Sequence, residues 1–252
     1  MQMEFAVNKP IVVVLSANSE LGLGLVESLL KAKEWNVFST YRKNSEQLNN
    51  MYGQYEDSPQ ERVFQADLSK WNEVSEMFEK ISEVGRIWGV INCAGEATAK
   101  TIKNLSTEEV TYSLQTNAVS AFNVTKCGLD VMSRNGEGGG RIIHLSSVVV
   151  RRPVLGVVPY AMSKSAIEGL VKSSAGELGR KNITINALRL GYFDRGMAKR
   201  DVPIDLLTEI SGQNAVRKLG TPENLSSAID YLLSPRSSFQ TGSIIDLDGG
   251  LI

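Results

Sequence analysis

The pattern of apolar and polar positions at the start of the chain predicts a strand, a helix and a second strand. Ile11 to Leu15 is a continuous aliphatic run, which the small and polar residues Ser16 to Ser19 close. Between this turn and a second apolar run at Val37 to Tyr41, leucines recur at helical spacing: Leu21, Leu25, Leu29 and Leu30. A short run bounded by turn residues indicates a buried strand, and apolar residues every three or four positions indicate a helix.

The same alternation continues to the end of the chain. Further strands are expected at Val63 to Ala66, Gly89 to Cys93, Arg141 to Leu145, Ile183 to Leu188 and Ser243 to Leu247. Helices are expected near Asn72 to Val84, within Thr107 to Met132, over Tyr160 to Leu178, and from Thr221-Pro222 onward. Such alternation of doubly apolar strands with helices is typical of a parallel sheet. It predicts a single Rossmann-type, doubly wound α/β fold with a mostly parallel sheet, helices on both faces and a site at the strands' carboxyl ends.

The length leaves the number of domains open, because 252 residues lie at the upper end of what one domain holds. No Pro/Gly/Ser-rich linker, internal repeat or break in composition divides the chain. With 42% hydrophobic and 22% charged residues, the chain can bury a large core. We therefore predict one NAD(P)-binding domain over residues 1–252.

Charge and cysteine content narrow the range of partners. A formal net charge of -1, without a run of like charges, argues against nucleic acid and membrane surfaces. Two cysteines, Cys93 and Cys127, and one histidine leave little for a disulfide framework or a transition metal, so no metal is expected. Met1 to Pro10 lacks the apolar stretch of a signal peptide, and no apolar run is long enough to span a bilayer. We expect a cytoplasmic protein with reduced thiols.

A small turn with two glycines joins the first strand to the first helix. It reads Ala17-Asn18-Ser19-Glu20-Leu21-Gly22-Leu23-Gly24. Such a turn can present backbone N–H groups and a helix amino terminus to a pyrophosphate, and glycine lets the backbone approach closely. Glycine near a helix start can also serve packing alone, but a position between the first strand and helix favours dinucleotide binding.

Tyr160 and Lys164 lie four residues apart, and Ser147 stands thirteen residues before the tyrosine, just past an expected strand. Residues four apart on a helix project from one face and can converge on one ligand. Taken alone, this spacing is more typical of an exposed helix face. The motifs elsewhere in the chain change that interpretation.

Taken together, these motifs resemble those of the short-chain dehydrogenase/reductase family, from about Pro10 to the C-terminus. The glycine turn is similar to the family's Thr-Gly-x-x-x-Gly-x-Gly, although Ala17 and Asn18 replace the Thr and the first Gly. Asn is the least costly substitute if this position needs a left-handed backbone. The other matching segments are Asn92-Cys93-Ala94-Gly95, Asn117 within Gln115-Thr116-Asn117, Gly191, and Asp246 to Gly250.

The resemblance implies transfer of a hydride between a nicotinamide and a carbonyl or alcohol carbon. Reduction of a carbonyl builds negative charge on its oxygen, so a proton donor and a hydrogen-bond donor lower the barrier. Tyr160 and Ser147 are the candidates. The Lys164 ammonium would favour the ionised phenol and, by resemblance, hold the nicotinamide ribose. By resemblance Asn117 anchors a water in the proton relay; the alternative is a plain polar residue of a helix.

The end of the second strand predicts NADP(H) as the cofactor. Relatives that prefer NAD place an acidic residue there, whereas this chain has Tyr41-Arg42-Lys43. A basic pair can accept a 2′-phosphate, with exposed surface charge as the alternative, and Glu20 argues against NADP(H). The residues expected at the cofactor are Asn18, Glu20, Leu21, Gly22, Leu23, Gly24, Tyr41, Arg42, Lys43, Asp67, Leu68, Asn92, Ala94, Gly95, Tyr160, Lys164, Gly191 and Phe193.

Two departures from the family pattern fall near the nicotinamide end, where Leu190 replaces Pro and Arg195 replaces Thr. His144 has no partner at a spacing that would suggest a catalytic pair, so we expect it to pack within the sheet, and we expect Cys93 in the core.

The activity that the resemblance implies is NADPH-dependent reduction of a ketone to an alcohol, similar to the 3-oxoacyl-carrier-protein reductases and related carbonyl reductases. The alternatives are NADP-dependent alcohol oxidation, an epimerase or dehydratase, and a cofactor-binding sensor without turnover. An enoyl reductase is disfavoured, since those relatives space Tyr and Lys more widely. Family members usually form tetramers, so we expect a homotetramer or a dimer.

Five basic residues flank the expected substrate end: Arg151, Arg152, Arg195, Lys199 and Arg200. If they face the pocket mouth, the small-molecule substrate carries a carboxylate or phosphate, or hangs from an acidic carrier. The alternative is that they are exposed charges on a mobile lid.

Overall fold

The computed structural model describes residues 9–55, 60–134 and 139–251. Within these ranges seven strands form one parallel sheet in the order β3-β2-β1-β4-β5-β6-β7. The strands are β1 (Ile11–Leu15), β2 (Asn36–Tyr41), β3 (Val63–Gln65), β4 (Ile87–Asn92), β5 (Gly140–Ser147), β6 (Ile183–Leu190) and β7 (Ile244–Leu247). The order reverses between β1 and β4, and a ligand crevice is expected beyond the carboxyl ends of the strands at such a point.

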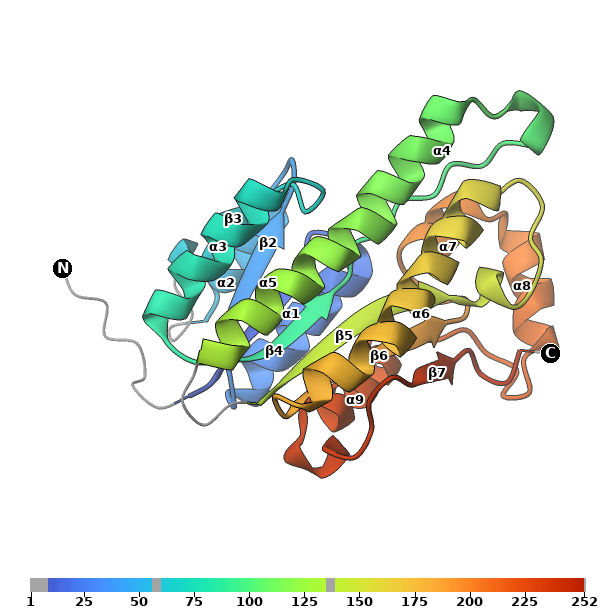
Figure 1. Cartoon of the computed structure of the whole chain (residues 1–252). Helices are drawn as coiled ribbons and strands as arrows, with labels where there is room; N and C mark the ends of the chain where they lie inside the picture. The colour runs from blue at the N-terminus through green and yellow to red at the C-terminus, as the bar shows by residue number, and fades with distance from the viewer. Residues whose placement is uncertain (1–8, 56–59, 135–138, 252) are drawn as a thin grey trace.

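Helices cover both faces of the sheet (Figure 1). One face carries α3 (Trp71–Val84), α5 (Ser120–Arg134) and α6 (Val158–Gly179), and the other carries α1 (Glu20–Ala32), α2 (Glu46–Tyr52) and α9 (Pro222–Leu233). Helix α4 (Thr107–Leu114) continues into α5 through a π-helical turn at Gln115–Val119. The short helices α7 (Met197–Asp201) and α8 (Ile204–Gln213) lie beyond the end of β6.

Strand β1 shows why the sheet needs cover on both faces. All five of its side chains are buried, and successive side chains point to opposite faces. Ile11, Val13 and Leu15 belong to the core cluster beneath α3, α5 and α6. Val12 and Val14 belong to the cluster beneath α1, α2 and α9. Because each buried aliphatic side chain contributes about 1.5–3 kcal/mol, this strand fixes the position of the turn that follows it.

The order of strands and helices expected from the sequence is confirmed, with parallel strands and helices on both faces. Pro222 opens α9 as predicted, and the Thr221 N–H before it donates to the Asn224 side chain. Helices α2, α7 and α8 were not predicted. Helices α2 and α7 are too short to show a helical period, and α8 comes directly after the charged residues of α7. No helix in the described ranges is both long and apolar enough to cross a membrane. The prediction that Met1 to Pro10 contains no signal peptide concerns mainly residues 1–8, which lie outside the described residues.

Candidate functional site

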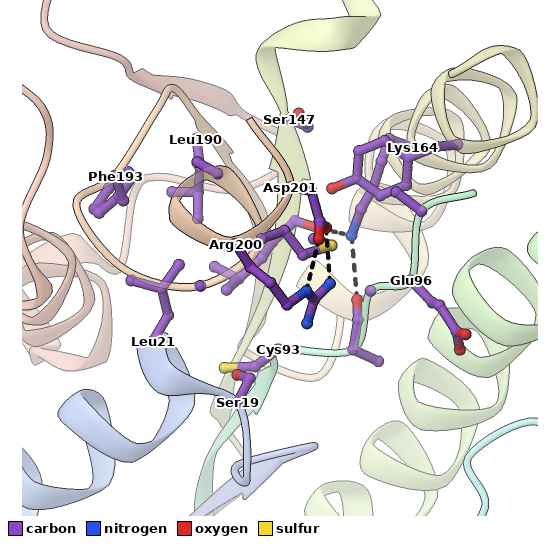
Figure 2. A pocket seen from close by; sticks show the side chains of 18 of the residues that line it. Ser19, Leu21, Cys93, Glu96, Ser147, Lys164, Leu190, Phe193, Arg200 and Asp201 are labelled. Atoms are coloured by element: carbon purple, nitrogen blue, oxygen red, sulfur yellow. Dashed lines mark hydrogen bonds and ion pairs between the residues drawn. The ribbon is translucent and has the colours of Figure 1, made fainter. Parts of the chain in front are cut away.

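A cavity of about 1030 Å³ opens at the carboxyl ends of the strands. Each strand from β1 to β6 contributes a residue at or just beyond its end: Ser16, Arg42, Ala66, Cys93, Ser147 and Gly191. Helix α6 adds Tyr160 and Lys164, and α7 covers part of the opening. In Figure 2 the Arg200–Asp201 ion pair of α7 lies between Lys164 and Ser147 on one side and Ser19 and Cys93 on the other.

Hydrogen bonds from β2 shape the glycine turn after β1. Thr40 accepts the Ser16 N–H with its side chain and the Ala17 N–H with its carbonyl oxygen. Ser16 adopts the left-handed backbone, at φ 53°, and Asn18 does not, so the condition under which Asn would be favoured at position 18 does not apply. The chain turns one residue past the end of β1, where these two hydrogen bonds hold it. A Cβ on Gly22 would lie 2.8 Å from the Ala17 backbone, and glycine is therefore required there.

The start of α1 and the neighbouring loop line one wall of the cavity. The Ser19 hydroxyl accepts the Gly22 N–H and caps the helix. Glu20 does not point to the basic pair after β2; its carboxylate accepts the Gly196 N–H at 2.9 Å and so ties the turn to the segment before α7. Leu21 also lines the cavity, beneath Gly196.

Arg42, Lys43, Asp67 and Leu68 line the opposite end of the cavity, next to the carboxyl ends of β2 and β3. Burial alone would raise the pKa of the Asp67 carboxyl, but hydrogen bonds from Ser69 and the charges of Arg42 and Lys70 lower it below its usual value. The structure thus brings together two cations and a carboxylate at this end.

Ser147, Tyr160 and Lys164 converge at the inner end of the cavity. Burial raises the pKa of the Tyr160 phenol to about 12, although a hydrogen bond with Ser147 lowers it. The Lys164 nitrogen lies 5.6 Å from the centre of the Tyr160 ring, and burial lowers its pKa to about 8. Burial dominates the pKa of this phenol, because the ring is almost fully removed from water, and the effect of the ammonium on the phenol stays a prediction. The phenol therefore keeps its proton at neutral pH, as a proton donor must.

The Lys164 ammonium links the ends of two strands. It donates to the Ala94 carbonyl oxygen at 3.1 Å and to the Leu145 carbonyl oxygen at 2.7 Å. These bonds hold α6 against the ends of β4 and β5, with the same side chain exposed to the cavity. A Cβ on Gly95 would lie 3.2 Å from the Lys164 nitrogen, so glycine leaves that nitrogen accessible.

Asn117 sits in the π-helical turn, fully buried behind the cavity. Its amide group donates to the Glu96 carbonyl and to the Ser163 hydroxyl and accepts the Glu96 N–H, each at 2.9 Å. The side chain thus braces the loop after β4 against α6. Its part in a proton relay stays a prediction.

Six of the residues predicted for the site do not line the cavity: Gly22, Leu23, Gly24, Tyr41, Asn92 and Asn117. Leu23 and Tyr41 pack against the core on the α1 face, and a Cβ on Gly24 would meet Pro222 of α9 at 2.8 Å. Their contribution is to packing behind the site. Asn92 accepts the Ala94 N–H and shapes the loop after β4.

His144 packs inside the sheet, as expected. Its Nδ1 lies 3.2 Å from the Asn92 amide nitrogen and its Nε2 lies 2.9 Å from the Thr125 hydroxyl. Burial, assisted by the charge of Lys164, lowers its pKa to about 3. The imidazole is therefore neutral in the folded protein over the ordinary pH range.

We predict that this single histidine makes the fold sensitive to mild acid. In the unfolded chain its pKa is near 6.5, so below that pH the unfolded state takes up a proton that the folded state refuses. The contribution of the neutral imidazole to the free energy of unfolding is then fully present above about pH 6.5 and is lost as the pH falls towards 3. We expect the free energy of unfolding to fall by about 2 kcal/mol between pH 7 and pH 5. Chemical denaturation at several pH values measures this. His144→Gln should lose most of the slope; an equal slope in that variant would contradict the assignment.

The structure does not bring the five basic residues together at the substrate end, and it agrees with the alternative that they are mostly surface charges. Arg151 pairs with Asp246 at 2.9 Å and donates to the Leu251 carbonyl, and Arg152 donates to Gln213. Neither lines the cavity, nor does Lys199. The C-terminal segment and α8 supply partners for these arginines, which the sequence pattern could not place.

The substrate end is instead largely apolar. Its lining side chains are Val148, Val149, Val154, Leu155, Val157, Leu190, Tyr192, Met197, Val202, Pro203 and Leu206, with Arg195 and the paired Arg200 and Asp201 as its charges. Apart from Leu190, these side chains come from residues 148–159 and 192–214, the two segments in which the sequence places substrate binding, but such segments carry no motif that identifies the individual residues. Cys93, expected in the core, lines the cavity as well, although burial raises the pKa of its thiol to about 12.

Comparison with known proteins supports the resemblance that the sequence motifs indicate. Residues 17–252 match the family model described as enoyl-(acyl carrier protein) reductase. The chain belongs to the short-chain dehydrogenase/reductase family. It is 32% identical to the acetoacetyl-CoA reductase of Cupriavidus necator, over 74% of this chain and 75% of that protein. It is 33% identical to the 3-oxoacyl-acyl-carrier-protein reductase FabG of Chlamydia muridarum, over 73% and 74% of the two chains.

Solved structures support the fold of this short-chain dehydrogenase/reductase. A short-chain type dehydrogenase/reductase from Mycobacterium ulcerans superposes with a TM-score of 0.88 at 24% identity, over 96% of this chain and 89% of the other. An actinorhodin polyketide ketoreductase crystallised with NADPH gives a TM-score of 0.86 at 23% identity, over 97% and 98%. The family indicated by the sequence motifs is thus confirmed, and the chain is an oxidoreductase of this family.

Proposed function

We propose that this short-chain dehydrogenase/reductase is an NADPH-dependent ketoreductase whose proton donor is Tyr160. The observation that carries the proposal is the convergence of Ser147, Tyr160 and Lys164 at the inner end of one long cavity. Relatives named as acetoacetyl-CoA and 3-oxoacyl reductases support the direction of the reaction. The four-residue spacing of Tyr160 and Lys164 favours ketone reduction over enoyl reduction.

The residues along the cavity can each be assigned to a part of a dinucleotide. Glycine is sterically required at Gly22, and a Cβ on Gly191 would lie 2.7 Å from the Asp248 backbone, so the cleft is bounded by closely packed main chain. The first turn of α1 would face the pyrophosphate, since a helix amino terminus favours anions. Arg42 and Lys43 would hold the 2′-phosphate, Asp67 and Leu68 the adenine, and Lys164 the nicotinamide ribose. When bound, NADPH supplies the hydride.

Tyr160 and Ser147 act on the carbonyl oxygen of the substrate, and Lys164 positions them. Tyr160 donates a proton to it as charge develops, and its raised pKa keeps that proton in place until then. The Ser147 hydroxyl donates a hydrogen bond to the same oxygen and orients the phenol. Lys164, fixed by the Ala94 and Leu145 carbonyls, sets the position of α6 relative to both.

We propose an apolar 3-oxoacyl compound as the substrate, bound through a thioester to coenzyme A or to a carrier. The apolar lining around Leu190 and Leu206 suits an acyl chain, and Arg195 and Arg200 are the cations left to meet an anionic carrier. We further propose that residues 1–252 act as one domain in a cytoplasmic homo-oligomer. Alcohol oxidation on the same site is the second candidate, because the same groups catalyse both directions.

The direct test is NADPH oxidation with a panel of ketones. We expect acetoacetyl and longer 3-oxoacyl thioesters to be reduced, with kcat/KM rising as the acyl chain lengthens by the first few methylenes. Measurement of the reverse reaction with the matching alcohols defines the preferred direction. Binding of NADPH without turnover of any ketone or alcohol would instead support a cofactor-binding sensor.

Cofactor preference gives a separate prediction. A charge-assisted contact with a 2′-phosphate is worth roughly 1.5–3 kcal/mol, or about tenfold or more in affinity. Arg42→Ala should therefore weaken NADPH binding about tenfold and leave NADH binding within about twofold. Calorimetric titration measures both constants, with Arg134→Ala, at the C-terminal end of α5 and outside the cavity lining, as the control. Equal affinity of the parent protein for the two cofactors would refute this preference.

A further inference from the structure

The carboxylate of Glu96 lies against the basic pair that we propose for the 2′-phosphate. The Arg42 guanidinium donates to Glu96 Oε2 at 3.0 Å, and the Tyr112 hydroxyl of α4 donates to the same oxygen at 3.0 Å. Arg42 and Glu96 both line the cavity. Figure 2 shows the Glu96 carboxylate turned away from Lys164, so it serves the adenosine end and not the catalytic end.

The backbone of Glu96 is held on both sides by one buried side chain. Its N–H donates to the Asn117 side-chain oxygen and its carbonyl oxygen accepts from the Asn117 side-chain nitrogen, each at 2.9 Å. Asn117 is fully buried and also bonded to Ser163. The residue is therefore fixed at its α-carbon, and its carboxylate reaches the Arg42 guanidinium from a rigid base.

This carboxylate competes with a phosphate for the same donors. A 2′-phosphate carries a charge of about −1.5 to −2 and would approach a guanidinium whose Nη2 already donates to Glu96 and whose Nη1 donates to Tyr112. Asp67 adds a second negative charge nearby, since Arg42 contributes to its lowered pKa. Glu96 also orients Arg42, which would favour phosphate binding, but we expect this effect on the affinity to be smaller. The side chains of Arg42 and Glu96 are 34% and 45% exposed, and such ion pairs contribute little.

We propose that Glu96 limits the affinity for the 2′-phosphate and thereby sets the ratio of NADPH to NADH binding. The inference rests on the proposed assignment of Arg42 to the 2′-phosphate. Substitution by glutamine removes the charge but keeps an oxygen that can accept from Arg42 and Tyr112. Glu96→Gln therefore isolates the electrostatic part of the effect.

The experiment uses two ligands that differ only in this phosphate, adenosine 2′,5′-bisphosphate and adenosine 5′-monophosphate. Calorimetry with the full chain should show that Glu96→Gln binds the bisphosphate at least about fivefold more tightly, since like charges near a shared donor are unfavourable. Binding of the monophosphate should change by less than about twofold. Glu79→Gln is the matched control, because the Glu79 side chain is as exposed as that of Glu96 and pairs with Arg134 away from the cavity.

Each other result overturns the proposal. Weaker bisphosphate binding by Glu96→Gln would make Glu96 an orienting residue, and unchanged binding would make the ion pair a surface contact only. Arg42→Ala in the same assay distinguishes failure of the role proposed for Glu96 from failure of the proposed 2′-phosphate site. If it loses the discrimination between the ligands while Glu96→Gln gains none, the role of Glu96 alone fails. If it changes nothing, Arg42 does not hold the phosphate, and the proposed cofactor site fails with it.

Discussion

Tyr160→Phe is expected to abolish turnover while leaving cofactor binding close to normal. The substitution removes only the hydroxyl, which we propose as the proton donor and which shares a hydrogen bond with Ser147. General acid catalysis typically contributes about 10²–10⁴-fold, and kcat should fall by a factor in that range. The ring itself is preserved beneath the Lys164 nitrogen, so α6 and its contacts with Ala94 and Leu145 keep their geometry.

The measurement is steady-state ketone reduction together with calorimetric titration of NADPH. Tyr231→Phe, which removes the hydroxyl of an exposed tyrosine on α9, serves as the control and should leave kcat unchanged. Lys164→Ala should in contrast impair both turnover and cofactor binding, because that side chain joins two strand ends and lines the cavity. A Tyr160→Phe variant that kept more than about a tenth of its kcat would rule out the phenol as the acid.

The positions of the main residues of this site could be predicted because apolar runs in the sequence show where the strands end. Ser147 is the last residue of β5, and residues 160 and 164 lie on one long helix, so their convergence follows from the parallel topology. Arg42 follows directly from the end of β2. In each case the position along a regular element determines the position in space.

The partners of the charged side chains could not be predicted in the same way. Arg151 bonds to Asp246 and Leu251, about a hundred residues later in the chain, and Glu20 bonds to Gly196 across an even larger separation. The position of Glu96 beside Arg42 depends on the loop after β4, which has no period. Ion pairs between loops depend on tertiary packing, so the sequence left open whether the pocket mouth is cationic, and the structure has a largely apolar one.

A buried ion pair beneath the proposed catalytic residues is the basis of the second large prediction. Glu168 lies one helical turn after Lys164 on α6 and is 5% exposed. It accepts from Arg189 of β6 at two positions, at 2.9 and 2.7 Å, and from the Ser146 hydroxyl of β5 at 2.7 Å. Arg189 continues the network to Asp246 of β7. The network thus clamps α6 to the carboxyl ends of three strands, at the level where Ser147 meets the cavity.

Glu168→Ala should therefore lower the free energy of unfolding by about 3 kcal/mol, since removal of one partner leaves a largely buried guanidinium with only part of its compensation. Glu168→Gln keeps the volume and an acceptor for Ser146, and its cost should be smaller. Glu79→Ala, which breaks the exposed pair with Arg134, should cost less than about 1 kcal/mol. Urea denaturation measures all three. Because α6 also carries Tyr160 and Lys164, the folded Glu168→Gln protein should show a reduced kcat with little change in NADPH affinity. A loss in Glu168→Ala no larger than that in Glu79→Ala would show that the clamp contributes nothing, and Arg189 would then be satisfied by Asp246 alone.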